Sequence, residues 1–144
     1  MASEPQAPGR TESRVPIQSD ADVVVARQKG RARAAAAGRS GTGLTVVAPA
    51  LAELARNIVA YAVRGEVVLR LVESAGRRGI EVVARDQGPG IADVALALQD
   101  GYSTGHGLGL GLPGTRRLMD EFSIQSAPGK GTIISVRKWA HNRP

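Results

Sequence analysis

Two pairs of β-rich runs, each joined by a short turn, do most to limit the folds open to this chain. Val67–Val72 and Ile80–Arg85 flank a turn that contains glycine and arginine, and Phe122–Ala127 and Thr132–Lys138 flank Pro128–Gly131. Such pairs are typical of β-hairpins, whose strands are antiparallel neighbours. We therefore expect a sheet that is mixed and mainly antiparallel.

The rest of the pattern predicts one more strand and four helices. The strand is expected at Val15–Gln18 and the helices at Asp20–Ala37, Thr45–Ala62, Ile91–Leu98 and Leu112–Asp120. Asp20 is suited to an N-cap, and Pro49 must lie in the first turn of its helix because a proline deeper inside would break the hydrogen-bond ladder. Leu51, Leu54 and Ile58 share one helix face. The order β-α-α-β-β-α-loop-α-β-β predicts an α/β fold, an α+β two-layer sandwich with helices on one face of the sheet.

Length and composition fit one globular domain. The 144 residues are 42% hydrophobic but only 3% aromatic, so the core must be built from Val, Leu, Ile and Ala. The absence of cysteine excludes disulfides and cysteine metal sites. Because we find no run of about 18 apolar residues and no signal-peptide h-region, we expect a cytoplasmic domain that does not cross a membrane. We assign residues 1–14 to a disordered leader, residues 15–140 to the domain and residues 141–144 to a short tail.

The net charge of +6 comes from 19 basic and 13 acidic residues. Such an excess is compatible with an acidic partner, with nucleic acid or with a solvated surface alone. The basic residues are scattered, apart from Arg27, Lys29, Arg31 and Arg33, and there is little aromatic surface on which bases could stack. The charge therefore favours a protein partner or solubility over nucleic acid.

Glu53 and Asn57 stand one helical turn apart in the string ELARN. Side chains at this spacing share a helix face, so both can point into one cavity. An amide oxygen is a hard, neutral ligand suited to Mg²⁺, and a carboxylate can act as a general base or orient water. An ordinary polar helix face would carry the same pattern, so the pair by itself does not establish a site.

The string DQGPG at Asp86–Gly90 directly follows an expected strand. An aspartate at a strand end can accept a hydrogen bond from the exocyclic amine of adenine, and Gly88 and Gly90 would let the backbone approach a ligand closely. The same residue types form plain turns, which is the alternative. Thr132, in a Gly-Lys-Gly-Thr string, could support adenine through water or could simply begin a strand.

The run GHGLGLG at Gly105–Gly111 directly precedes an expected helix. Alternate glycines leave backbone N–H groups free to face an anion, and the helix N-terminus adds its dipole. No Walker A string is present. A G-x-G-x-x-G match at 109–114 lacks the preceding strand and the later acid of a dinucleotide-binding fold. The run therefore indicates a phosphate cradle of another kind.

Taken in order, these strings resemble the N, G1, G2 and GT boxes of the GHKL superfamily, which includes gyrase, MutL and the ATPase domains of histidine kinases. ELARN, DQGPGI, DGYSTGHGLGLGLPGTRRLMDEFS and GKGT are similar to the strings of the RsbT-type serine/threonine switch kinases, in the anti-sigma regulatory factor group. The resemblance spans about Val15 to Trp139 and is most specific over Gly105–Phe122. It implies a Bergerat fold, with ATP held beneath a mobile lid.

The resemblance also implies a role for each matched residue. Glu53 is the expected general base, Asn57 the Mg²⁺ ligand and Asp86 the residue that reads adenine. The other ATP-binding residues that it implies are Gly88, Gly90, Gly105, Gly107, Gly109, Gly111 and Thr132. We assign no catalytic role to His106, and we expect Trp139 to anchor the final strand.

The function implied is ATP-dependent phosphorylation of a serine or threonine on a STAS-domain protein of the RsbS or RsbR type in the stressosome. The released kinase would then activate a PP2C-type phosphatase such as RsbU in a partner-switching pathway. Three alternatives stay open: an anti-sigma factor of the RsbW type that holds a sigma factor directly, a histidine-kinase ATPase domain, and a basic nucleic-acid binder.

Overall fold

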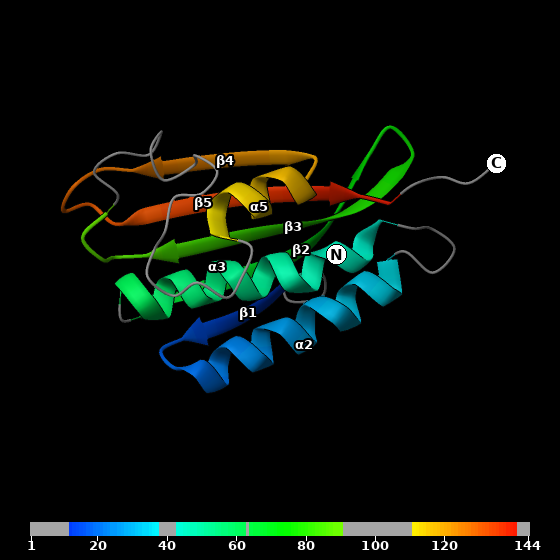
Figure 1. The fold of residues 1–144 in the computed structure, drawn as a ribbon. Helices are drawn as coiled ribbons and strands as arrows, with labels where there is room; N and C mark the ends of the chain where they lie inside the picture. Colours follow the sequence, from blue (N-terminus) through cyan, green and yellow to red (C-terminus); the bar gives the residue numbers. More distant parts are fainter. Residues whose placement is uncertain (1–11, 38–42, 63, 91–110, 141–144) are drawn as a thin grey trace, which may run out of the picture.

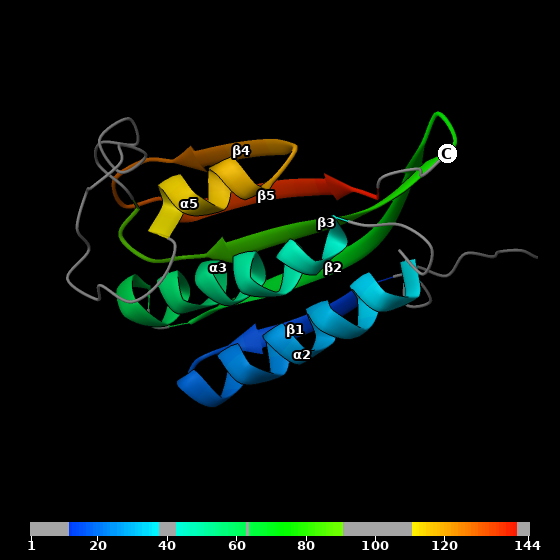
Figure 2. The same ribbon diagram turned by 45° about the vertical axis from the view of Figure 1, so that its right-hand side comes forward.

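A five-stranded sheet carries three α-helices on one face in the computed structural model, which describes residues 12–37, 43–62, 64–90 and 111–140 (Figure 1). The described elements, in chain order, are β1 (Glu12–Ile17), α2 (Asp20–Ala37), the 3-10 turn η1 (Leu44–Val46), α3 (Val47–Tyr61), β2 (Gly65–Ser74), β3 (Arg77–Asp86), α5 (Gly111–Leu118), β4 (Glu121–Ser126) and β5 (Thr132–Trp139). Figure 2 shows the same two layers from a second direction. The predicted two-layer sandwich is confirmed.

The strand order across the sheet is β1-β2-β3-β5-β4, and all four neighbouring pairs are antiparallel. Both predicted hairpins are present, as β2–β3 and β4–β5. The sequence pattern did not reveal that β5 lies between β3 and β4, because hairpin signals report only local pairing. The helix expected at Ile91–Leu98 lies outside the described residues.

The core lies between α3 and the sheet. Leu51, Leu54 and Ile58, predicted to share a helix face, are each 0–1% exposed. They belong to one buried cluster with Val67 of β2 and Ile80 of β3, which are both 0% exposed. Full burial of a leucine or isoleucine side chain contributes about 1.5–3 kcal/mol, so this layer holds α3 firmly on the sheet.

The start of α3 agrees with the sequence, since Pro49 lies in its first turn. By length and composition, Leu44–Tyr61 is the one helical segment of the described chain that could span a membrane. Half of that segment is buried inside the fold. Its buried side chains belong to the core, as in the central helix of a packed domain.

Small residues allow α2 to pack closely against α3. Ala26, Gly30 and Ala34 recur every fourth residue along α2 and are all buried. A Cβ atom on Gly30 would lie 2.8 Å from Leu51 Cδ2, closer than two such carbons can approach. A side chain at this position of α2 would therefore force the buried Leu51 to move.

The N-terminus of α2 differs from the expected one. Asp20 is the first helical residue rather than the cap. The Asp22 carboxylate accepts a hydrogen bond from the backbone N–H of Gln18 at 2.8 Å. The bond resembles that of a capping box, in which an acid in the first turn accepts a hydrogen bond from a backbone N–H that precedes the helix.

The sheet face without a described helix holds a row of alternating charges. Glu12, Arg70, Glu81, Arg137 and Glu121 are directly opposed partners on successive strands of the sheet. Glu81, in the middle, is only 6% exposed, and its carboxylate accepts hydrogen bonds from Arg70 Nε at 2.9 Å and Arg137 Nε at 2.8 Å. Burial alone would raise the pKa of Glu81, but the hydrogen bonds and charges of the two arginines lower it.

This lowered pKa makes the stability of the fold depend on pH. The Glu81 carboxylate should stabilise the fold fully above the pKa of an unfolded glutamate, about 4.3, and lose that contribution as pH falls through its lower folded pKa. We expect Glu81→Gln to reduce the free energy of unfolding by about 2 kcal/mol at neutral pH, and by less once the wild-type carboxylate is protonated. Urea unfolding at neutral pH and in acid measures both effects.

Glu73→Gln is the matched control for Glu81→Gln. Glu73 also pairs with an arginine, Arg78, but its side chain is 67% exposed, so its loss should change the free energy of unfolding little at either pH. If the two substitutions had equal effects, the charge row would not be a stabilising feature of the sheet.

The turn between β2 and β3 contains an unfavourable alanine. Ala75 and Gly76 connect the paired residues Ser74 and Arg77, with φ angles of 52° and 78°. Positive φ at both positions is typical of a type I′ turn, in which Asn-Gly is preferred. Because a left-handed alanine costs about 1–2 kcal/mol, we expect Ala75→Asn to raise the free energy of unfolding by roughly 0.5–1 kcal/mol in urea titrations. Ala75→Val should lower it, and a stabilising valine would contradict this turn geometry.

Candidate nucleotide-binding site

The residues predicted to hold adenine meet at the end of the sheet where β3 ends. Asp86, Thr132 and Ser126 are directly opposed on β3, β5 and β4. Because side chains alternate along a strand, they share the face of Ala84 and Ile134, which are buried in the core beneath the helices. Figures 1 and 2 show the end of β3, the C-terminal end of α3 and the β4–β5 turn at this same end of the molecule.

The Asp86 side chain is held in place by the backbone of the loop that follows β3. Its carboxylate is half-buried, and Oδ1 accepts a hydrogen bond from the backbone N–H of Gly88 at 2.9 Å. This bond makes an Asx turn that fixes the side chain at the strand end. Asp86 forms no ion pair with the part of the chain that the structure describes, so the carboxylate keeps acceptor capacity for a ligand N–H group.

Thr132 is paired with a second hydroxyl that no motif indicated. Thr132 is 7% exposed, and its Oγ1 lies 2.8 Å from Ser126 Oγ. Ser126 Oγ donates to the backbone carbonyl of Gly131 at 3.1 Å. Since Ser126 has one hydroxyl proton, Thr132 is the donor between the two hydroxyls. Counting the register of the predicted β4–β5 hairpin is the only signal that could have found Ser126.

Three glycines let the surrounding segments close around this end of the sheet. A Cβ atom on Gly88 would lie 2.6 Å from Ala62 Cβ, and one on Gly90 would lie 2.0 Å from the carbonyl oxygen of Ala127. One on Gly131 would lie 2.3 Å from the carbonyl oxygen of Asp86. The loop after β3 is therefore packed between α3 and the β4–β5 turn, and Gly88 and Gly90 are required for that packing besides any contact with a ligand.

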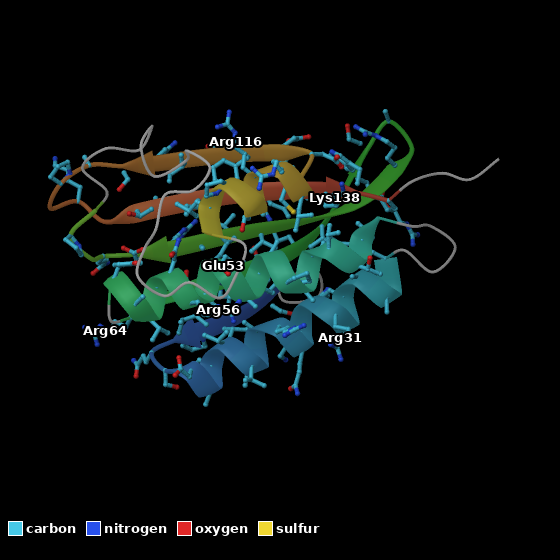
Figure 3. The ribbon with its side chains drawn as sticks, in the orientation of Figure 1. Arg31, Glu53, Arg56, Arg64, Arg116 and Lys138 are labelled. Atoms are coloured by element: carbon cyan, nitrogen blue, oxygen red, sulfur yellow. The ribbon has the colours of Figure 1, made fainter. Side chains whose placement is uncertain are left out.

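Glu53 and Asn57 both lie on α3, one turn apart, as predicted. Figure 3 shows Glu53 where α3 runs alongside α5, and the two helices are in contact. The side chain of Glu53 is 12% exposed, and its Oε1 accepts a hydrogen bond from Arg56 Nη2 at 3.2 Å. Arg56 is a residue of the site that the sequence patterns did not single out.

The C-terminal end of the glycine run begins α5. Gly111 has a φ angle of 65°, in the left-handed region that glycine tolerates. The fully buried Thr115 donates from Oγ1 to the carbonyl oxygen of Gly111 at 2.9 Å, which ties the first turn together. Gly105, Gly107 and Gly109 lie outside the described residues, as does His106.

The residues present fit a magnesium ion that is shared with a nucleotide. Asn57 is half-buried, and its amide makes no hydrogen bond within the described chain, so its oxygen is available as a hard ligand. No group of three or more His, Cys, Asp or Glu side chains that could hold a metal occurs among the described residues. Mg²⁺ commonly takes only one or two protein ligands and completes its shell with phosphate oxygens and water.

The chain is similar to known proteins over most of its length. The sequence profile of the histidine kinase-like ATPase domain matches residues 17–138. Serine/threonine-protein kinase RsbT of Bacillus subtilis (strain 168) is 45% identical over 128 residues, which are 89% of this chain and 96% of that protein. The range matched by the profile, residues 17–138, includes every described residue of the candidate site.

Anti-sigma F factors are similar over shorter stretches. The protein of Thermoanaerobacter sp. (strain X514) is 32% identical over 78 residues, which are 52% of this chain and 53% of that protein. The protein of Caldanaerobacter subterraneus is 31% identical over 96 residues, which are 62% of this chain and 66% of that protein. From the profile match over most of its length, and from the fold that carries it, the chain belongs to the histidine kinase-like ATPase domain family.

Proposed function

We propose that this protein is an ATP-dependent serine/threonine kinase that phosphorylates a hydroxyl group on a partner protein. The observation that carries the proposal is its 45% identity over 89% of the chain to the kinase RsbT. Such an enzyme needs groups for phosphoryl transfer and groups that bind adenine. We assign the first role to Glu53 and Asn57 on α3, and the second to Asp86 and Thr132 at the end of the sheet.

In the proposed mechanism, Asp86 accepts a hydrogen bond from the exocyclic amine of adenine, with Thr132 beside it. Glu53 accepts the proton of the attacking hydroxyl, whose oxygen bonds to the γ-phosphorus as the bond to the β–γ bridging oxygen breaks and ADP leaves. Asn57 would hold Mg²⁺, which supplies charge neutralisation at the phosphates. Gly105, Gly107, Gly109 and Gly111 would face the phosphates with their backbone N–H groups.

For partners, we propose STAS-domain proteins of the RsbS or RsbR type as substrates, and a PP2C-type phosphatase of the RsbU type as the protein activated afterwards. The support is the similarity to RsbT over 96% of the length of that kinase. We accordingly propose that the protein acts in the cytoplasm, in a stressosome-type partner-switching pathway of the stress response.

The role of Glu53 and Asn57 can be tested by substitution. We expect Glu53→Gln to lower phosphoryl transfer at least about 100-fold, because the amide cannot take the proton. Asn57→Ala should lower transfer and raise the Mg²⁺ concentration that it requires. Transfer of ³²P from ATP to a purified RsbS-type protein measures both effects, with urea unfolding to confirm that the variants fold.

The exposed substitution Glu73→Gln, which also removes one carboxylate, is the control and should leave transfer unchanged. Normal transfer by both site variants would show that Glu53 and Asn57 do not have the proposed roles. Absence of transfer by the wild-type protein to any STAS-domain substrate would remove the kinase proposal itself.

The phosphate role of the glycine run calls for a measurement in solution. We expect Mg·ATP to slow amide hydrogen exchange over residues 105–111, because their N–H groups would donate to the phosphates. AMP, which lacks the β- and γ-phosphates, is the control and should slow exchange much less. Equal protection by ATP and AMP, or none by either, would contradict the phosphate assignment.

The anti-sigma F factors among the relatives favour one alternative, an anti-sigma factor of the RsbW type that binds a sigma factor directly. The two proposals differ in the partner protein that they predict. Purification of the tagged protein should bring down STAS-domain proteins if it is a switch kinase. A sigma factor in their place would favour the alternative.

A further inference from the structure

We propose that Arg56 is a positioning residue that holds the Glu53 carboxylate in the orientation needed for proton transfer. The inference rests on the proposed role of Glu53 as general base and adds to it Arg56, a residue of the ELARN string to which the sequence analysis gave no role. It starts from one observed contact on α3, between Arg56 Nη2 and Glu53 Oε1 at 3.2 Å.

The contact joins side chains in different environments. The Glu53 side chain is 12% exposed, whereas the Arg56 side chain is 47% exposed. Arg56 therefore reaches the carboxylate from the solvent side of α3. A mostly buried carboxylate needs hydrogen-bond donors, and a guanidinium provides a charged one in a fixed plane.

Glu53 has an alternative that would disable the site. Asn57 is four residues further along α3, so its amide NH₂ group could donate to the Glu53 carboxylate. Such a bond would turn the acid away from a substrate hydroxyl and would tie up the residue proposed to bind Mg²⁺. In the structure Asn57 makes no hydrogen bond within the described residues, while Glu53 bonds to Arg56. In this arrangement Glu53 pairs with Arg56, and the Asn57 amide stays available for a ligand.

A purely structural role for Arg56 would be minor. The Arg56 side chain is 47% exposed, so water can reach its place when it is shortened to glutamine, whose amide can still donate to the Glu53 carboxylate. α3 is held on the sheet by the buried Leu51, Leu54 and Ile58 instead. A variant of Arg56 should therefore fold normally, which allows its effect on activity to be read directly.

Other arginines on the helical layer differ from Arg56 in one respect. Figure 3 labels Arg31 on α2, Arg64 after α3 and Arg116 on α5, all exposed. Within the described residues these three form no ion pair with an acid. They carry the same charge on the same side of the molecule, so they are matched controls for general attraction of ATP or of an acidic partner.

The test measures the kinetics of ³²P transfer from ATP to an RsbS-type protein. We expect Arg56→Gln to lower kcat about tenfold, because a loosely held base spends less time in reach of the proton, with both KM values unchanged. Arg56→Lys should recover part of the loss. Arg64→Gln and Arg116→Gln should leave kcat unchanged.

A double substitution identifies the route of the effect. If Arg56 acts through Glu53, then Arg56→Gln should cause no further loss when Glu53 is already glutamine. An unchanged kcat for Arg56→Gln would overturn the inference. So would a raised KM for ATP or for the partner, which would mean that Arg56 contacts one of them directly.

Failure of this inference is distinguishable from failure of the proposed function. If Glu53→Gln itself keeps full activity, Glu53 is not the base, and the proposed function loses its chemistry. If Glu53→Gln is inactive but Arg56→Gln is not, the base assignment stands and only the positioning role of Arg56 is wrong.

Discussion

The pairing of β3 with β5 joins two hairpins that are separated in the chain by residues 91–110 and α5. The register runs from Gly79 opposite Trp139 to Asp86 opposite Thr132. One end of this ladder thereby aligns the candidate adenine-binding residues. The other end is secured by Trp139, whose Nε1 donates to Glu121 at 2.9 Å and whose ring lies 4.4 Å from the Arg77 guanidinium. Trp139 thus anchors the final strand, as its position had suggested.

The two faces of this sheet are stabilised in different ways. The inner face packs against α3 and excludes water, which is the larger contribution to folding. The outer face, which no described helix covers, places opposite charges on neighbouring strands and so satisfies even the nearly buried Glu81. Arginine stems can shield apolar neighbours, and Val68 on this face is only 6% exposed. A sheet face that carries such a charge row can therefore be stabilised by contacts within the sheet itself.

The candidate site combines one local part with one assembled part. Glu53, Arg56 and Asn57 belong to consecutive turns of one helix, so their spacing is fixed as soon as α3 forms. The adenine end instead needs three strands and a turn to come together. Gly88 connects the two parts, because the loop after β3 packs against Ala62 at the end of α3. This contact sets the distance between the Glu53–Asn57 pair on α3 and the proposed adenine-binding residue Asp86.

The sequence predicted the elements that the structure describes, both hairpins and the Glu53–Asn57 spacing, because each depends on residues close together in the chain. It also indicated the family, through motifs whose order is specific even where each is common. Strand order and register, in contrast, come from the tertiary structure, which puts β5 beside β3 and Ser126 beside Thr132. These features follow from packing and register between distant segments, which local propensity does not encode. The pairing of Arg56 with Glu53 is partly predictable. Their spacing along the helix allows the contact, but only the structure shows that the carboxylate is mostly buried and so needs a donor.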